Sequence, residues 1–165
     1  MVKLFGKEYS KEELLRKVGD VSQLGGVRLI ELSDGKERGV RAADFRTGTG
    51  FNFTVLIDRG LDISWAEYKG MSLCWHSATR QVAPHFFEPE GFGWLRSFYG
   101  GLMVTCGLTY MGAPGDDPAH PIQVSGAPCC ELGRVRLGLH GRASNTPATN
   151  VWVDGMWEGD EYLMW

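Results

Sequence analysis

The chain has 165 residues, with 43% hydrophobic residues, 22% charged residues and a formal net charge of −3 at pH 7. These values are typical of one soluble globular domain, and they exclude a general electrostatic attraction to nucleic acid or anionic membranes. No apolar stretch is long enough to span a bilayer, and residues 1–10 lack the apolar core of a signal peptide. We therefore expect a cytoplasmic protein.

Glycine and tryptophan are unusually frequent, since the chain contains 23 Gly, six Trp and eight Phe. Many glycines without a repeat are typical of a β-protein with many tight turns. Tryptophan rings stack on the apolar faces of sugars, but they are also ordinary core residues. The composition favours an all-β fold and leaves a carbohydrate site and simple core packing both open.

The first predicted element is a short helix that starts at Ser10. Ser10 and Glu13 form a capping box, in which each side chain accepts the backbone N–H of the other residue. Gly19 is placed to end the helix. We expect a single domain over residues 1–165, with a helical lead-in at residues 1–20 and strands in residues 21–165.

From residue 27 onward, apolar and polar residues alternate between glycine-rich turns, which predicts β-strands. We expect strands at residues 27–32, 38–45, 51–58, 63–68, 71–75, 102–108, 122–125, 131–137 and 150–153. The long aromatic segment 76–96 is expected to pack over another part of the molecule. Residues 112–121 are expected to form an exposed loop.

The last residues of the chain, 151–165, are predicted to form a hairpin whose second arm has only begun. An apolar, aromatic strand is unusual at the end of a complete domain. We therefore expect a β-sandwich domain that is incomplete at its C-terminus. A C-terminal half, a complementary chain or a homo-oligomer would complete its sheets.

Polar side chains gather just after the predicted strand 131–137. His140, Arg142 and Asn145 follow that strand, and Gly141 permits a turn between them. Polar groups at a strand end are a common way for β-proteins to bind small polar ligands. A histidine satisfied within a turn and an arginine in a surface ion pair would give the same pattern, so both interpretations stay open.

Three motifs resemble those of one known family when taken in order. They are residues 58–63 (Asp-Arg-Gly-Leu-Asp-Ile), residues 100–108 with Gly-Gly-Leu at the start and Thr-Cys-Gly-Leu at the end, and residues 139–142 (Leu-His-Gly-Arg). Together they resemble an uncharacterised branch of the galactose mutarotase-like superfamily, the relatives of aldose 1-epimerase. The resemblance runs from about Phe5 onward. It implies that this chain is the N-terminal portion of a longer, twisted β-sandwich.

The resemblance also implies a role for His140. In characterised mutarotases, the histidine of the Leu-His-Gly motif holds sugar hydroxyls and assists at the ring oxygen. The general acid and the general base of that family lie further along its chain than Trp165. The implied chemistry opens and closes a sugar ring by acid and base catalysis, without a metal or an organic cofactor.

Arg59 and Asp62 follow a predicted strand end, where they could grip sugar hydroxyls or form a buried ion pair that pins the turn. Arg142 lies two residues from His140, so on an extended stretch both would point to one face. Arg142 would then suit a carboxylate or phosphate on the substrate, or orient a catalytic carboxylate.

Three further residues of the aromatic regions are candidates for the ligand site. His85 could provide a second imidazole, and Trp94, with Trp75 as second choice, could stack on the ligand. Core packing would explain either tryptophan equally well.

The leading functional hypothesis is a carbohydrate-binding, aldose 1-epimerase-like isomerase, or the substrate-holding part of one, with a small carbohydrate as partner. A non-catalytic sugar-binding module is the alternative. A metal-dependent cupin-type isomerase is disfavoured because the four histidines are scattered singly. The cysteines are expected to be reduced, and their spacings match no zinc site: Cys74, Cys106, Cys129 and Cys130.

Overall fold

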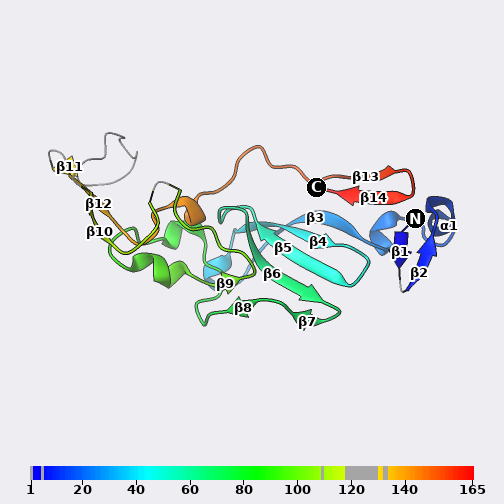
Figure 1. Ribbon diagram of the computed structural model, residues 1–165, viewed down its shortest axis with the longest axis horizontal. Coiled ribbons are helices and arrows are strands. Elements are labelled where there is room, and N and C mark those ends of the chain that lie inside the picture. The colour runs from blue at the N-terminus through cyan, green and yellow to red at the C-terminus, as the bar shows by residue number, and fades with distance from the viewer. Residues whose placement is uncertain (1, 5, 109, 118–129, 132–133) are drawn as a thin grey trace.

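The computed structural model describes residues 2–4, 6–108, 110–117, 130–131 and 134–165. It is a mostly β protein built from antiparallel sheets with one short helix, as predicted (Figure 1). The expected strand 122–125, and the side chains of Cys129 and Cys130, lie outside the described residues.

The central sheet has five antiparallel strands in the order β3-β4-β5-β6-β7. Their bounds are β3 (Gly26–Glu31), β4 (Arg41–Arg46), β5 (Phe51–Leu56), β6 (Asp62–Tyr68) and β7 (Met71–Ser72). The first four confirm the strands predicted from alternation. The strand expected at 71–75 is instead divided between β7 and β8 (Trp75–His76), which pairs with β9 (Gly100–Gly101) in a separate sheet.

The N-terminal unit consists of β1 (Val2–Leu4), β2 (Lys7–Tyr9) and α1 (Lys11–Leu15). The predicted capping box is present: Glu13 N–H donates to Ser10 Oγ over 3.2 Å, and Ser10 N–H donates to Glu13 Oε2 over 2.8 Å. The helix ends at Leu15, not at Gly19 as expected. Only Leu14 of its residues is buried, so little tertiary packing supports a longer helix.

Several predictions about the second half of the chain differ from the structure. Residues 102–108 contain only an isolated bridge at Met103. The predicted loop 112–121 contains β10 (Gly115–Asp117), and the predicted strand 131–137 is divided between β11 (Cys130–Glu131) and β12 (Arg134–Leu137). No strand forms at 150–153; the C-terminal hairpin is β13 (Gly155–Glu158) with β14 (Glu161–Met164), whose second arm is as long as its first.

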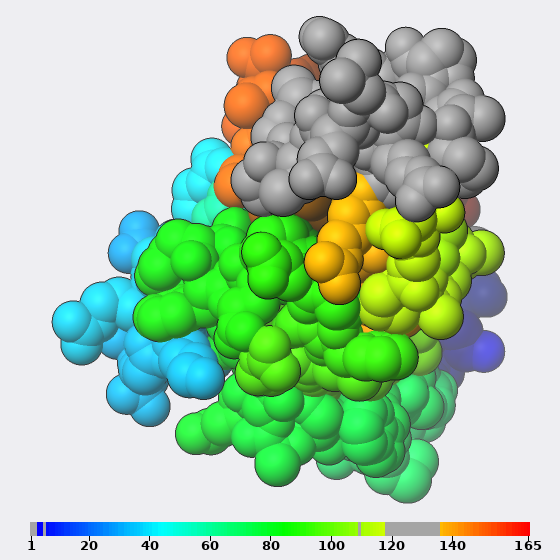
Figure 2. Space-filling view, turned by 90° about the vertical axis from the view of Figure 1, so that its left-hand side faces the viewer, coloured from blue at the N-terminus to red at the C-terminus, as the bar shows by residue number. Residues whose placement is uncertain are grey.

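The buried core lies at one end of the central sheet. It consists of five buried residues, with Ile30 and Leu32 packed against them: Val40, Ala42, Leu56, Ala83 and Tyr99. Ala83 and Tyr99 belong to the long aromatic segment and its continuation, so this segment packs over the sheet end as predicted. In the end-on view, the green residues near 80–100 lie beside the yellow-green residues near 110–117 and the orange segment that follows β12 (Figure 2).

Candidate functional site

The residues after β12 form a sharply turned loop that presents His140. His140 and Gly141 have φ values of 55° and 64°, so two successive residues adopt the left-handed conformation. Leu139 N–H donates to Gly91 O over 2.9 Å, and His140 N–H donates to Gly112 O over 3.3 Å. A histidine in this conformation costs free energy that the surrounding contacts must supply, and such strain is concentrated at functional sites.

The His140 side chain is half-buried, and its two ring nitrogens have different environments. Nδ1 is buried and has no hydrogen-bond partner in the described part of the chain. Nε2 is not among the buried unpaired atoms of the described residues. An unpaired buried nitrogen costs free energy that a bound hydroxyl or water would recover.

Trp94 supports the His140 ring from the interior. The two rings meet edge to face, with centroids 4.8 Å apart and planes 84° apart. Trp94 is 5% exposed, stacks on Phe98 at 5.0 Å and donates from Nε1 to Ser144 Oγ over 2.7 Å. Its faces are therefore already covered. The prediction that Trp94 stacks on a ligand is not supported by this position, which matches the alternative of core packing.

Asn145 holds the second unpaired polar atom of the same loop. Its Nδ2 donates to Ser144 Oγ over 3.2 Å, whereas the buried Oδ1 has no partner among the described residues. Ser144 Oγ thus joins Asn145 to Trp94 and, through the Trp94 ring, to His140. The loop therefore contains an imidazole and a carboxamide that both have unused hydrogen-bonding capacity, as a binding site for a polar ligand would.

Arg59 is buried and fixes this loop to the aromatic segment. The side chain is 1% exposed, and its guanidinium donates to three backbone carbonyls: Ser144 O over 2.9 Å, Val82 O over 2.5 Å and Ser97 O over 3.0 Å. Burial lowers the pKa of Arg59. Because all these donors point at the protein's own backbone, Arg59 is placed to organise the loop and not to grip a sugar.

Asp62 is buried in the same region and accepts hydrogen bonds from two groups of the protein. Its Oδ2 accepts the Tyr99 hydroxyl over 3.0 Å, and its Oδ1 accepts Thr105 N–H over 2.6 Å. The Arg59 guanidinium lies 5.0 Å from the centre of the Tyr99 ring. Arg59 and Asp62 thus pin the turn through Tyr99 and backbone groups, which is close to the structural alternative, although the two side chains form no direct ion pair. Burial raises the pKa of Tyr99.

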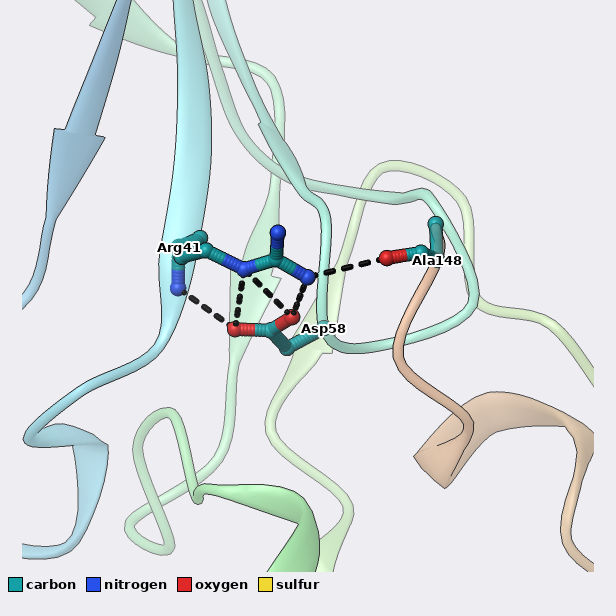
Figure 3. Close-up of polar contacts among 3 residues, drawn as sticks. All are labelled: Arg41, Asp58 and Ala148. Carbon is teal, nitrogen blue, oxygen red and sulfur yellow. Dashed lines mark hydrogen bonds and ion pairs between the residues drawn. The ribbon is translucent and has the colours of Figure 1, made fainter. Parts of the chain in front are cut away.

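Sequence reasoning missed the ion pair between Arg41 and Asp58 (Figure 3). Arg41 Nη2 lies 2.6 Å from Asp58 Oδ1, Arg41 N–H donates to Asp58 Oδ2 over 2.8 Å, and Nη2 also donates to Ala148 O over 2.9 Å. The bond to Asp58 raises the pKa of Arg41. The pair fastens the segment that follows the His140 loop to the central sheet. The sequence feature that could have pointed to this ion pair is Asp58, which stands next to Arg59 in the motif at residues 58–63.

The three motifs that carried the resemblance converge on the His140 loop. Gly60 has a φ of 63°, and a Cβ there would lie 3.1 Å from Ala143 O. A Cβ at Gly107 would collide with the carbonyl oxygens of Tyr110 and His140. Both glycines therefore allow close approach of backbone to the loop. The motifs at residues 58–63 and 100–108 thus hold the motif at residues 139–142 in place.

The remaining candidate residues, Arg142, His85 and Trp75, are exposed. Arg142 is exposed, and the left-handed residues 140 and 141 break the extended geometry that would have put it on the same face as His140. His85 is exposed and packs on Phe86 with centroids 4.3 Å apart. Trp75 is 64% exposed, and its ring lies 6.0 Å from that of Phe98, which stacks on Trp94.

A depression of about 570 Å³ lies beside the His140 loop. Its walls are residues 87–91 and the side chains of Arg96 and Arg136. Arg96 forms an ion pair with Glu88, and this bond lowers the pKa of Glu88. Since Gly91 O bonds Leu139 N–H, the depression and the His140 turn share a wall.

Among the described residues, no group of three His, Cys, Asp or Glu side chains is placed to hold a metal ion. Cys74 and Cys106 are free thiols, and burial raises the pKa of Cys74. None of the helices that the structure describes has the length and apolar character needed to cross a membrane.

Comparison with known proteins agrees with the fold. A family model described as a domain of unknown function (DUF4432) matches residues 37–165. Comparison with curated proteins gives no significant match. Among solved structures, the chain is similar to one from Klebsiella pneumoniae subsp. pneumoniae that is provisionally described as an aldose 1-epimerase. The TM-score is 0.56 and the identity 25%, over 78% of this chain and 32% of that chain. This chain thus spans about a third of the solved chain, and the predicted resemblance is confirmed.

Proposed function

Because the chain belongs to the DUF4432 family, and its fold is similar to part of an aldose 1-epimerase-like structure, we propose that it holds a carbohydrate. The ligand sits against the His140 loop, in the manner of the substrate-holding part of an aldose 1-epimerase. The observation that carries the proposal is His140 itself. A strained, half-buried imidazole, whose Nδ1 has no hydrogen-bond partner among the described residues, is placed against Trp94 by three separate segments.

The geometry assigns different tasks to the atoms of the loop. Nε2 of His140 is the nitrogen that meets a ligand hydroxyl, because Nδ1 is buried. A hydroxyl both donates and accepts, so it pairs with a neutral imidazole in either tautomer. Arg142 is exposed at the rim, where it would meet an acidic substituent on the sugar. Arg59, Asp62 and Trp94 keep the loop in shape.

A non-catalytic binding module is the second candidate, and the bonding of the nearby carboxylates favours it for these 165 residues. Ring opening needs a carboxylate that is free to take a proton from the anomeric hydroxyl. Asp58 is bonded to Arg41, and Asp62 is bonded to Tyr99 and Thr105. Both carboxylates thus already hold structural bonds, which favours binding over proton transfer by these two residues.

The direct test is binding of simple sugars to the wild type and to a His140→Asn variant. Asparagine tolerates the left-handed conformation, so the variant keeps the turn while losing the imidazole. We expect the dissociation constant for hexoses or pentoses, measured by NMR titration, to rise about tenfold or more, which corresponds to about 1.4 kcal/mol. His85→Asn is the matched control and is expected to bind as the wild type does.

Two results would count against this proposal. Equal sugar affinity of wild type and His140→Asn would remove His140 from the site, and no binding by any hexose, pentose or sugar phosphate would reject the carbohydrate. Polarimetry on fresh α-sugars then separates the two candidates. Accelerated anomer exchange identifies an epimerase, and binding without acceleration identifies a binding module.

A further inference from the structure

Two buried side-chain atoms of the His140 loop have no hydrogen-bond partner among the described residues, namely His140 Nδ1 and Asn145 Oδ1. Asn145 is only 8% exposed, so its carboxamide lies in the interior of the protein. Buried polar atoms in folded proteins ordinarily have partners, and each one without a partner calls for an explanation. Because the two atoms belong to one short loop, a common explanation is favoured.

Trp94 and Ser144 hold the two residues in one neighbourhood. The Trp94 ring meets the His140 imidazole edge to face, with centroids 4.8 Å apart, and Trp94 Nε1 donates to Ser144 Oγ over 2.7 Å. Asn145 Nδ2 donates to the same oxygen over 3.2 Å. Trp94 and Ser144 are both buried. The imidazole and the carboxamide are thus joined by the same buried pair of side chains.

The Ser144 hydroxyl has one hydrogen more than these bonds use. A hydroxyl oxygen has two lone pairs and one hydrogen, and both lone pairs accept bonds here, from Trp94 and from Asn145. The hydroxyl hydrogen is therefore left for another acceptor. One bridging water would accept it and donate its own two hydrogens to Asn145 Oδ1 and His140 Nδ1, which satisfies every atom if Nδ1 is an acceptor. If Nδ1 carried a hydrogen instead, one hydrogen of the water would stay unused.

The Asn145 carboxamide has a second arrangement, which leads to the same result. Rotation by 180° exchanges its oxygen and its nitrogen, so that Ser144 O–H donates to Oδ1 and Nδ2 takes the buried position of the unpaired atom. Nδ2 is only a donor, so a hydrogen on His140 Nδ1 would then set two donors against each other. Both arrangements therefore leave His140 Nδ1 as the acceptor.

We propose that Asn145 and Ser144 are positioning residues of the site, which keep His140 Nδ1 as an acceptor so that Nε2 carries the hydrogen. The bond made by one nitrogen of a neutral histidine decides whether the other nitrogen is protonated. His140 therefore presents an N–H donor to the ligand, and the ligand atom that it meets is an oxygen lone pair. The statement about the ligand rests on the proposed function, whereas the position of the hydrogen is a property of the free protein.

The test locates the imidazole hydrogen of His140 by long-range ¹H–¹⁵N NMR correlation on the whole chain, labelled with ¹⁵N in histidine. The spectrum is recorded without ligand at about pH 8, where imidazoles with the ordinary pKa near 6.5 are neutral. We expect a larger fraction of the Nε2–H form at His140 than at the exposed His85.

Asn145→Asp replaces the carboxamide by a carboxylate, which only accepts hydrogen bonds and therefore favours a hydrogen on Nδ1. The ratio of the Nε2–H form to the Nδ1–H form of His140 should fall by about tenfold or more, the size of effect that an adjacent carboxylate has on a protonation equilibrium. Asn150→Asp is the matched control, because Asn150 is exposed and aspartate tolerates its φ of 54°. The control should leave the His140 signals unchanged, as a purely structural role of Asn145 would in both variants.

A wild-type spectrum dominated by the Nδ1–H form of His140 would overturn the proposal, and so would a wild-type ratio in a folded Asn145→Asp protein. Far-UV circular dichroism verifies folding. If Asn145→Asp does not fold, Asn145→Leu decides, because it keeps the approximate shape without any hydrogen-bonding group: its His140 ratio should approach that of His85, and an unchanged ratio would overturn the proposal. A protein that shows the expected ratios but binds no sugar would overturn the proposed function alone. A sugar-binding protein with the hydrogen on Nδ1 would overturn only this inference.

Discussion

Replacement of Arg59 by methionine is the sharpest test of how the His140 loop is held. The guanidinium satisfies three buried carbonyls, of Ser144, Val82 and Ser97. Methionine preserves much of the side-chain volume but donates to none of them. Each unsatisfied buried carbonyl costs about 1 kcal/mol or more, so the expected loss is about 3 kcal/mol in the free energy of unfolding. A small domain is stable by only about 5–15 kcal/mol.

The assay is urea unfolding followed by tryptophan fluorescence, since Trp94 is bonded to Ser144 in the affected loop. Arg142→Met is the matched control, because Arg142 is exposed and such substitutions change stability by about 0.5 kcal/mol or less. Arg59→Lys keeps the charge but cannot reach three diverging carbonyls, so it should behave like Arg59→Met. A loss below about 1 kcal/mol for both Arg59 variants, equal to that of the control, would refute the assigned role.

Three further predictions concern the same network. Trp94→Phe removes the Nε1 donor to Ser144 and should lower stability by about 1–2 kcal/mol in urea unfolding. Asp58→Asn weakens the bond to Arg41, so the thermal midpoint should fall at low salt, by less than for Arg59→Met. Tyr99 has its pKa raised above the ordinary 10.0 by burial, so the unfolded state loses its proton first as pH rises. The stability contributed by Tyr99 is therefore complete below about pH 10 and declines above it, and Tyr99→Phe should flatten the alkaline dependence of the unfolding free energy.

Each of these predictions has a contrary outcome. If Trp94→Phe leaves the urea midpoint of unfolding unchanged, the packing of the aromatic ring, and not the Nε1 hydrogen bond, supports His140. An Asp58→Asn protein that is as stable as the wild type in low salt would show that the ion pair contributes nothing. Identical alkaline curves for wild type and Tyr99→Phe would place the alkaline transition on other groups, among them the half-buried Cys74 thiol, whose pKa is also raised.

Much of the local structure followed from the sequence alone. Side-chain alternation, capping groups and glycine turns act within a few residues of the chain. They determine the capping box at Ser10, the first four strands of the central sheet and the C-terminal hairpin. The resemblance motifs likewise identified the loop that carries His140. Errors fell where the local pattern was weak, as at 102–108. An apolar run there lacks a strand partner and forms only one bridge, at Met103.

The tertiary structure decided what each polar residue does. Arg59 bonds carbonyls 23, 38 and 85 residues away, so no local pattern could reveal that its donors are already used. The turn at His140 and Gly141 likewise depends on bonds to Gly91 and Gly112, and it is this turn that separates His140 from Arg142. Side-chain periodicity is fixed by neighbours in the chain. Hydrogen-bond partners, burial and the left-handed backbone of the loop are fixed by segments that meet only when the chain folds.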